Sequence, residues 1–202
     1  MISLSPLALA WRGFARAVRR DEHGAVAIEF GLLALPFFAM IGAIMETAFY
    51  FMASQLLDSA VDHSVRLLRT GQAQTQAYTA DTFRGTICDR LFDMFDCSAD
   101  KLKIDVKTIS SFSAADFSYP LQLSTDPDHV GELIWKSNFN NYLPGSGSQI
   151  VSVKVYYKWP TLLDFLGFNL SNAGAGYRLM ASVRVFRNEP FGGSPSPVTS
   201  CS

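Results

Sequence analysis

The sequence predicts an α+β protein in which a long N-terminal helix, partly membrane-spanning, precedes a small domain with an antiparallel sheet. Three observations lead to this class: an apolar run near the N-terminus, apolar residues at helical spacing after it, and three later stretches that alternate apolar with polar residues. Of the 202 residues, 49% are hydrophobic and 17% charged, which excludes a disordered chain. The formal net charge of −1 argues against nucleic acid as a partner.

The apolar run predicts a transmembrane helix. No charged residue occurs from Phe30 to Met45, and the 28 residues from Ala25 to Met52 contain only two, Glu29 and Glu46. A helix needs about 20 mainly apolar residues to cross the hydrocarbon, so residues 25–52 are long enough. The apolar core of a secretory signal has roughly 7–15 residues, which favours a retained anchor over a cleaved signal. A buried core helix is the other alternative.

Basic residues around the span predict its orientation. The next basic residues after the span are Arg66 and Arg69. Four arginines precede it: Arg12, Arg16, Arg19 and Arg20. Because positive charge close to a span favours the cytoplasmic side, we expect the N-terminus in the cytoplasm and the C-terminal part outside.

Helical periodicity continues beyond the span. Apolar or small residues recur every three or four positions, at Phe49, Met52, Leu56, Ala60, Ser64 and Leu68. This spacing predicts one helix from about Ala25 to Thr70, ended by Gly71, with an amphipathic half over residues 53–71. A polar linker is expected over Gln72–Gln76. A four-residue apolar repeat predicts a second helix over Thr79–Phe95.

Three period-two stretches predict half-buried strands. Apolar residues alternate with polar ones over Leu102–Val106 and Val151–Tyr157. In the third stretch the alternating apolar positions are Leu179, Ala181, Val183 and Val185. The intervening Ser110–Ser148 is rich in turn signals and is expected to be mainly loop. A short helix is expected over Thr161–Phe168.

Cysteine placement predicts one disulfide. Cys88, Cys97 and Cys201 all lie on the expected outer side, where disulfides are permitted. A continuous helix would separate Cys88 from Cys97 by about 13 Å, beyond bridging range, so a Cys88–Cys97 bond requires the second helix to end before Cys97. Cys201 is then left either free or available to link chains.

No chemical motif predicts catalysis. The cysteines and histidines lack the paired spacing of zinc sites, and no G-x-S-x-G nucleophile motif occurs. We therefore expect neither an enzyme, nor a metal site, nor a cofactor.

The junction before the span resembles the processing site of type IV prepilins, and more closely that of the TadE-like family of tight-adherence (Flp) pilus assembly proteins. Its residues fit the pattern G-A-x-A-x-E-F-A/G-L-x-x-P, at Gly24, Ala25, Ala27, Glu29, Phe30, Gly31 and Pro36. The segment VRVFRNEPF, residues 183–191, is similar to the family's closing strand and tail.

This resemblance implies cleavage by a prepilin peptidase between Gly24 and Ala25, which would leave a new amine on Ala25. It also implies that Glu29 pairs with a neighbour's N-terminal amine during assembly, although a lipid-headgroup position would also suit Glu29. Phe30 and Pro36 belong to the same assembly segment, and Pro36 should kink or loosen the helix.

The expected organisation follows: cytoplasmic leader 1–24, transmembrane helix 25–52, amphipathic extension 53–71, exported α+β domain 72–190 and flexible tail 191–202. The expected function is that of a pilin-like pseudopilin in a bacterial inner membrane. Its expected partners are membrane lipid, sister pilins, prepilin peptidase and the pilus assembly platform. A single-pass envelope protein, whose exported domain binds a ligand or partner without entering a fibre, is the alternative.

Overall fold

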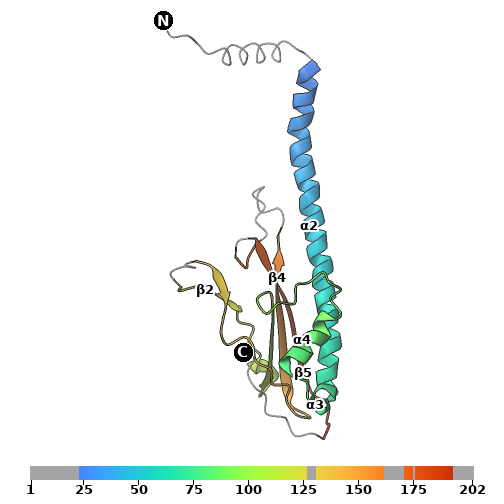
Figure 1. Ribbon diagram of the computed structural model, residues 1–202, viewed down its shortest axis with the longest axis vertical. Helices are drawn as coiled ribbons and strands as arrows, with labels where there is room; N and C mark the ends of the chain where they lie inside the picture. Colours follow the sequence, from blue (N-terminus) through green and yellow to red (C-terminus); the bar gives the residue numbers. More distant parts are fainter. Residues whose placement is uncertain (1–22, 127–130, 162–170, 175, 193–202) are drawn as a thin grey trace. The chain divides into compact units, whose positions relative to one another are not determined.

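The computed structural model describes residues 23–126, 131–161, 171–174 and 176–192 (Figure 1). Its helices are α2 (His23–Arg69), α3 (Gln72–Thr75), α4 (Ala80–Cys88) and the short 3-10 helix η1 (Phe112–Ala114). Its strands are β1 (Leu102–Ile109), β2 (Leu121–Leu123), β3 (Leu133–Trp135), β4 (Ile150–Pro160) and β5 (Tyr177–Arg187). The predicted α+β class is confirmed. The chain divides into two units, Met1–Met45 and Glu46–Ser202. The hydrophobic core lies in the second unit.

Helix α2 ends where the sequence predicts. Its last residue is Arg69, and Gly71 adopts a left-handed conformation with φ of 80°, which glycine adopts without the steric cost of a Cβ atom. The expected polar linker over Gln72–Gln76 is wrong, because Gln72–Thr75 forms the single helical turn α3. The side-chain amide of Gln74 links this turn to the end of α2, because it donates a hydrogen bond to the carbonyl of Leu68.

We expect Gly71→Ala to destabilise the domain by about 2 kcal/mol or more, because a left-handed alanine alone costs roughly 1–2 kcal/mol. A Cβ at Gly71 would also lie 2.5 Å from the ring of Phe191. Gly85→Ala is the matched control, since a Cβ there meets nothing within 4 Å, and we expect it to stabilise α4 by about 0.5–1 kcal/mol. Urea unfolding of the full chain in detergent, followed by near-ultraviolet circular dichroism, measures both. Equal shifts of the two variants would contradict the assignment.

The second helix is shorter than predicted. Thr79 caps it, accepting a hydrogen bond from the amide of Thr82 at 3.1 Å, but α4 stops at Cys88 rather than continuing to Phe95. The chain then turns back, with positive φ at Phe92 and Asp93. Leu91 and Phe95 are nevertheless buried with the helical residues Phe83 and Ile87. The apolar repeat therefore marks core positions correctly while overstating the length of the helix.

All three predicted strands form one antiparallel sheet in the order β1-β4-β5. In β4, Val151, Val153, Val155 and Tyr157 face the buried side of α2, whose core residues include Ala53, Leu57, Val61 and Leu68. Register places Ser182 of β5 beside Val155, and Arg184 beside Val153. Residues 182 and 184 therefore lie on the face of the sheet that α2 covers.

The other face of the sheet is also covered, which alternation in β4 does not predict. Ser152, Lys154 and Tyr156 are all buried, although they form the polar half of the alternating pattern. The segment expected to be mainly loop, Ser110–Ser148, supplies the cover: it contains η1 and the antiparallel pair β2–β3. Figure 1 shows β2 on the side of β4 that is away from α2.

Candidate membrane-anchoring and assembly site

Apolar side chains of α2 are exposed on every side of the helix from Val26 to Met45, and on one side of it from Phe49 to Met52. They are Val26, Ile28, Phe30, Leu32, Leu33, Leu35, Phe37, Phe38, Met40, Ile41, Ile44, Met45, Phe49, Phe51 and Met52. The first apolar residue of α2 in the buried core is Ala53. Among the described residues, α2 is the one helix long and apolar enough to span a membrane, judged by length and composition, and none of its most apolar window is buried. A helix that is apolar all round needs lipid or other helices around it.

The predicted processing residues lie in the first turns of α2. Gly24 and Ala25 are both helical, and Arg12, Arg16, Arg19 and Arg20 fall outside the described residues. A Cβ added at Gly24 would meet no atom within 4 Å, so packing against the described part of the chain does not require glycine there.

The acid and the proline of the motif share one side of the helix. At 100° per residue, Glu29 and Pro36 are seven positions apart and lie on the same face of α2. Phe30 points elsewhere and is 69% exposed. The chain remains helical on both sides of Pro36. Helical geometry thus places Glu29 and Pro36 on one face of α2 and Phe30 on an adjacent face.

The second acid of the apolar run behaves differently. Glu46 is only 8% exposed, whereas Glu29 is an exposed residue. Glu46 therefore belongs to the packed part of the chain.

Two aspartates of α2 hold β5 through one arginine, a contact that sequence reasoning missed. The Arg184 guanidinium donates to both carboxylate oxygens of Asp62, at 2.5 and 3.2 Å, and to Asp58 at 3.1 Å. Ser182 donates to Asp58 at 2.5 Å. Hydrogen bonding to Asp62 raises the pKa of Arg184 above its ordinary value. Asp58 and Asp62 are one helical turn apart, but nothing in the sequence indicates a partner more than 120 positions away.

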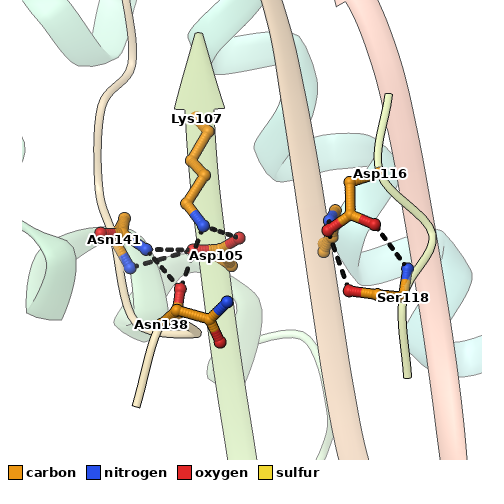
Figure 2. Close-up of polar contacts among 7 residues, drawn as sticks. Asp105, Lys107, Asp116, Ser118, Asn138 and Asn141 are labelled. Carbon is orange, nitrogen blue, oxygen red and sulfur yellow. Dashed lines mark hydrogen bonds and ion pairs between the residues drawn. The ribbon is translucent and has the colours of Figure 1, made fainter. Parts of the chain in front are cut away.

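Polar contacts attach the covering segment Ser110–Ser148, here termed the outer layer, to the sheet (Figure 2). Asp105 of β1, 1% exposed, accepts from the backbone and side-chain nitrogens of Asn141, at 3.1 and 2.6 Å. Its other oxygen lies 3.2 Å from Nζ of Lys107. A second contact joins Lys154 of β4 to Asp116 at 3.4 Å. Hydrogen bonds from Ser118 lower the pKa of Asp116 below its usual range.

Cys88 and Cys97 lie at disulfide distance, with sulfurs 2.08 Å apart and Cα atoms 6.2 Å apart. The turn that follows α4 makes this approach possible, as the spacing argument required. Beside it, a groove of about 650 Å³ lies between α2 and α4. His63 bonds Arg90 there at 2.8 Å, and burial, followed by the charges of Arg90 and Arg66, lowers the pKa of His63. Cys201 falls outside the described residues.

The last residues of the segment VRVFRNEPF, residues 183–191, contact both the end of α2 and the turn before β4. Asn188, which is buried, donates to the carbonyls of Pro144 and Ser146, each at 3.0 Å. The amide of Glu189 donates to the carbonyl of Arg69 at 2.8 Å. Phe191, expected in the flexible tail 191–202, lies against Gly71, while residues 193–202 are outside the described part. This segment thus ties the end of α2 to the turn before β4.

No group of three or more metal-ligating side chains occurs among the described residues. The absence of a cofactor, a metal and catalysis remains an expectation from the sequence.

A protein-family model, the TadE-like protein family, matches residues 24–66. This range begins at Gly24, contains Glu29 and Pro36, and continues into the buried half of α2. The match confirms the resemblance predicted from the N-terminal motif, and it relates the chain to membrane proteins of the tight-adherence (Tad) pilus. It does not extend to residues 183–191, whose resemblance stays a prediction. No curated protein and no solved structure gives a match.

Proposed function

We propose that this protein is a membrane-anchored, pseudopilin-like component of tight-adherence (Flp-type) pilus assembly. The observation that carries the proposal is the family match over residues 24–66. Within this range, the apolar side chains of α2 are exposed on all sides before residue 46. Such a surface suits lipid in the membrane and the helices of sister pilins during assembly. The second unit, Glu46–Ser202, includes the C-terminal part of α2 in its core.

In the proposed pathway, a prepilin peptidase cuts between Gly24 and Ala25. Among the described residues, no atom would contact a Cβ at Gly24. A contact outside the chain, such as a narrow protease site, would account for glycine at this position. The cut would remove the four arginines that orient the span and would place a new amine one turn before Glu29.

The proposed location is the bacterial inner membrane, with the N-terminus in the cytoplasm and the α+β domain outside. A Cys88–Cys97 pair at disulfide distance suits an oxidising compartment outside the cytoplasm. The proposed role is structural rather than enzymatic, with sister pilins and the assembly platform as partners. An envelope protein that never joins a fibre is the competing function.

N-terminal sequencing of membrane-extracted protein tests the processing step. We expect the wild-type chain to begin at Ala25, and Gly24→Leu to begin at Met1 or Ile2, because a bulky side chain blocks a site that accepts only glycine. Gly31→Leu is the matched control, since residue 31 also has nothing within 4 Å of an added Cβ, and it should be cleaved normally. A wild-type chain that keeps its first 24 residues would refute cleavage.

A further inference from the structure

Contacts along the second unit define which end of it adjoins the apolar segment. Helix α2 and strand β5 run side by side in the same direction: Tyr50 contacts Arg178, Asp58 contacts Ser182, and Arg69 contacts Glu189. Because β4 is antiparallel to β5, its last residues also lie beside Tyr50. The chain enters the unit at this end, directly from the exposed apolar part of α2.

This end combines aromatic rings with cations. The Arg178 guanidinium lies 4.3 Å from the ring centroid of Tyr50, and Nζ of Lys158 lies 5.1 Å from that of Trp135. Trp159 at the end of β4 is partly exposed. Tryptophan, tyrosine and basic residues with apolar stems are the side chains that favour the boundary between hydrocarbon and water.

The apolar part of α2 is also longer than the hydrocarbon requires. Residues 25–52 extend about 42 Å at ~1.5 Å per residue, against roughly 30 Å of hydrocarbon. Phe49, Phe51 and Met52 are 51%, 60% and 44% exposed. The excess of about 12 Å matches the headgroup layers, which bring the bilayer to about 40–45 Å. Tyr50 is within this excess, and Arg178 contacts it.

We propose that this end of the domain, defined by Tyr50, Trp159, Pro160, Tyr177 and Arg178 and here termed the interfacial end, lies in the lipid headgroup layer as a second membrane contact. Arg178 would meet lipid phosphates, and the aromatic rings would lie at the level of the acyl-chain boundary. The exposed apolar side chains of Phe49, Phe51 and Met52, on either side of Tyr50 in the chain, support lipid as the occupant. The inference rests on the proposed membrane anchoring.

Spin labels on the full chain test this contact. In a Cys201→Ser background, labels at Pro160→Cys and Gln72→Cys are compared in vesicles of phosphatidylethanolamine and phosphatidylglycerol. Both positions are exposed, but Gln72 lies beyond Arg69, at the opposite end of α2. We expect the ratio of oxygen to water-soluble nickel accessibility to be severalfold higher at 160. Equal, water-like ratios would overturn the proposal.

A second comparison tests whether the named side chains make the contact. Arg178→Gln together with Trp159→Ala should lower the accessibility ratio at 160 towards that at 72. Arg187→Gln, at the far end of the same strand, should leave it unchanged; an unchanged ratio in the double variant would contradict the assignment of these side chains. Flotation of the same samples separates the two proposals. Protein that fails to float refutes the anchor itself, whereas protein that floats with a water-exposed residue 160 refutes only the headgroup contact.

Discussion

Glu29→Ala is expected to reduce pilus assembly by roughly 30-fold or more, since about 2 kcal/mol corresponds to that factor. An ionised carboxylate within the hydrocarbon costs about 2.5–3.5 kcal/mol on insertion scales. A neighbour's amine on Ala25 would offset this cost only in the assembled state, so Glu29 would favour assembly over the isolated subunit. Counting surface pili in the bacterium, with co-purification of sister pilins, measures the loss.

Two variants of the same helix make this result specific. Glu29→Gln keeps the shape and hydrogen-bonding capacity without the charge, and we expect most of the loss to remain. Leu33→Ala changes an exposed residue one turn along the same face and should leave assembly near the wild-type level. If Glu29→Ala assembles normally, the headgroup position for Glu29 and the envelope-protein alternative are both favoured.

Asp105→Ala is expected to destabilise the domain by about 2–3 kcal/mol, because it removes a buried carboxylate that accepts two hydrogen bonds. The substitution leaves two nitrogens of Asn141 without their acceptor and Lys107 without its carboxylate. The same segment is bonded to β1 through the amides of Val106 and Leu143, so this edge of the sheet should loosen as well. Urea unfolding of the full chain in detergent gives the loss, and hydrogen exchange locates it.

Asp81→Ala is the matched control for that experiment. Its carboxylate is 84% exposed, and its ion pair with Arg84 spans 3.5 Å at the surface, where such pairs contribute about 0–1 kcal/mol. Asp105→Asn should fall between the two, because an amide oxygen can still accept from Asn141. A cost for Asp105→Ala no larger than that for Asp81→Ala would show that the outer layer does not depend on this carboxylate.

Local periodicity predicts much of this fold. Long α2, the left-handed stop at Gly71 and the three strands of the main sheet all follow from residue spacing within single segments. Periodicity fails where the structure depends on contacts between residues that are distant in the sequence. The chain turns back after Cys88 so that Cys97 lies beside it, and α4 is therefore shorter than the apolar repeat indicates. Strands β2 and β3 have three residues each, which is too short for alternation to be recognised.

Burial of polar residues is the other feature that sequence alone misses. Lys154 and Asp105 occupy positions that alternation assigns to solvent, yet both are covered by a segment more than 30 residues away in the chain. In the candidate site, Gly24, Glu29 and Pro36 could be found because a motif within 13 consecutive positions carries them. Arg184 could not, since its partners Asp58 and Asp62 are identified only by the packing of β5 on α2.

The contacts between α2 and β5 have a consequence for the timing of folding. They join residues 122–129 positions apart, and such non-local contacts fold slowly, because the entropy of closing the loop is lost before they form. If the chain crosses the membrane from its N-terminal side, the side of α2 that contacts β5 has no partner strand until β5 has also crossed. Asp58 and Asp62 would then lack their partners Ser182 and Arg184 until β5 has been exported, so α2 and β5 join only after nearly the whole domain has been delivered.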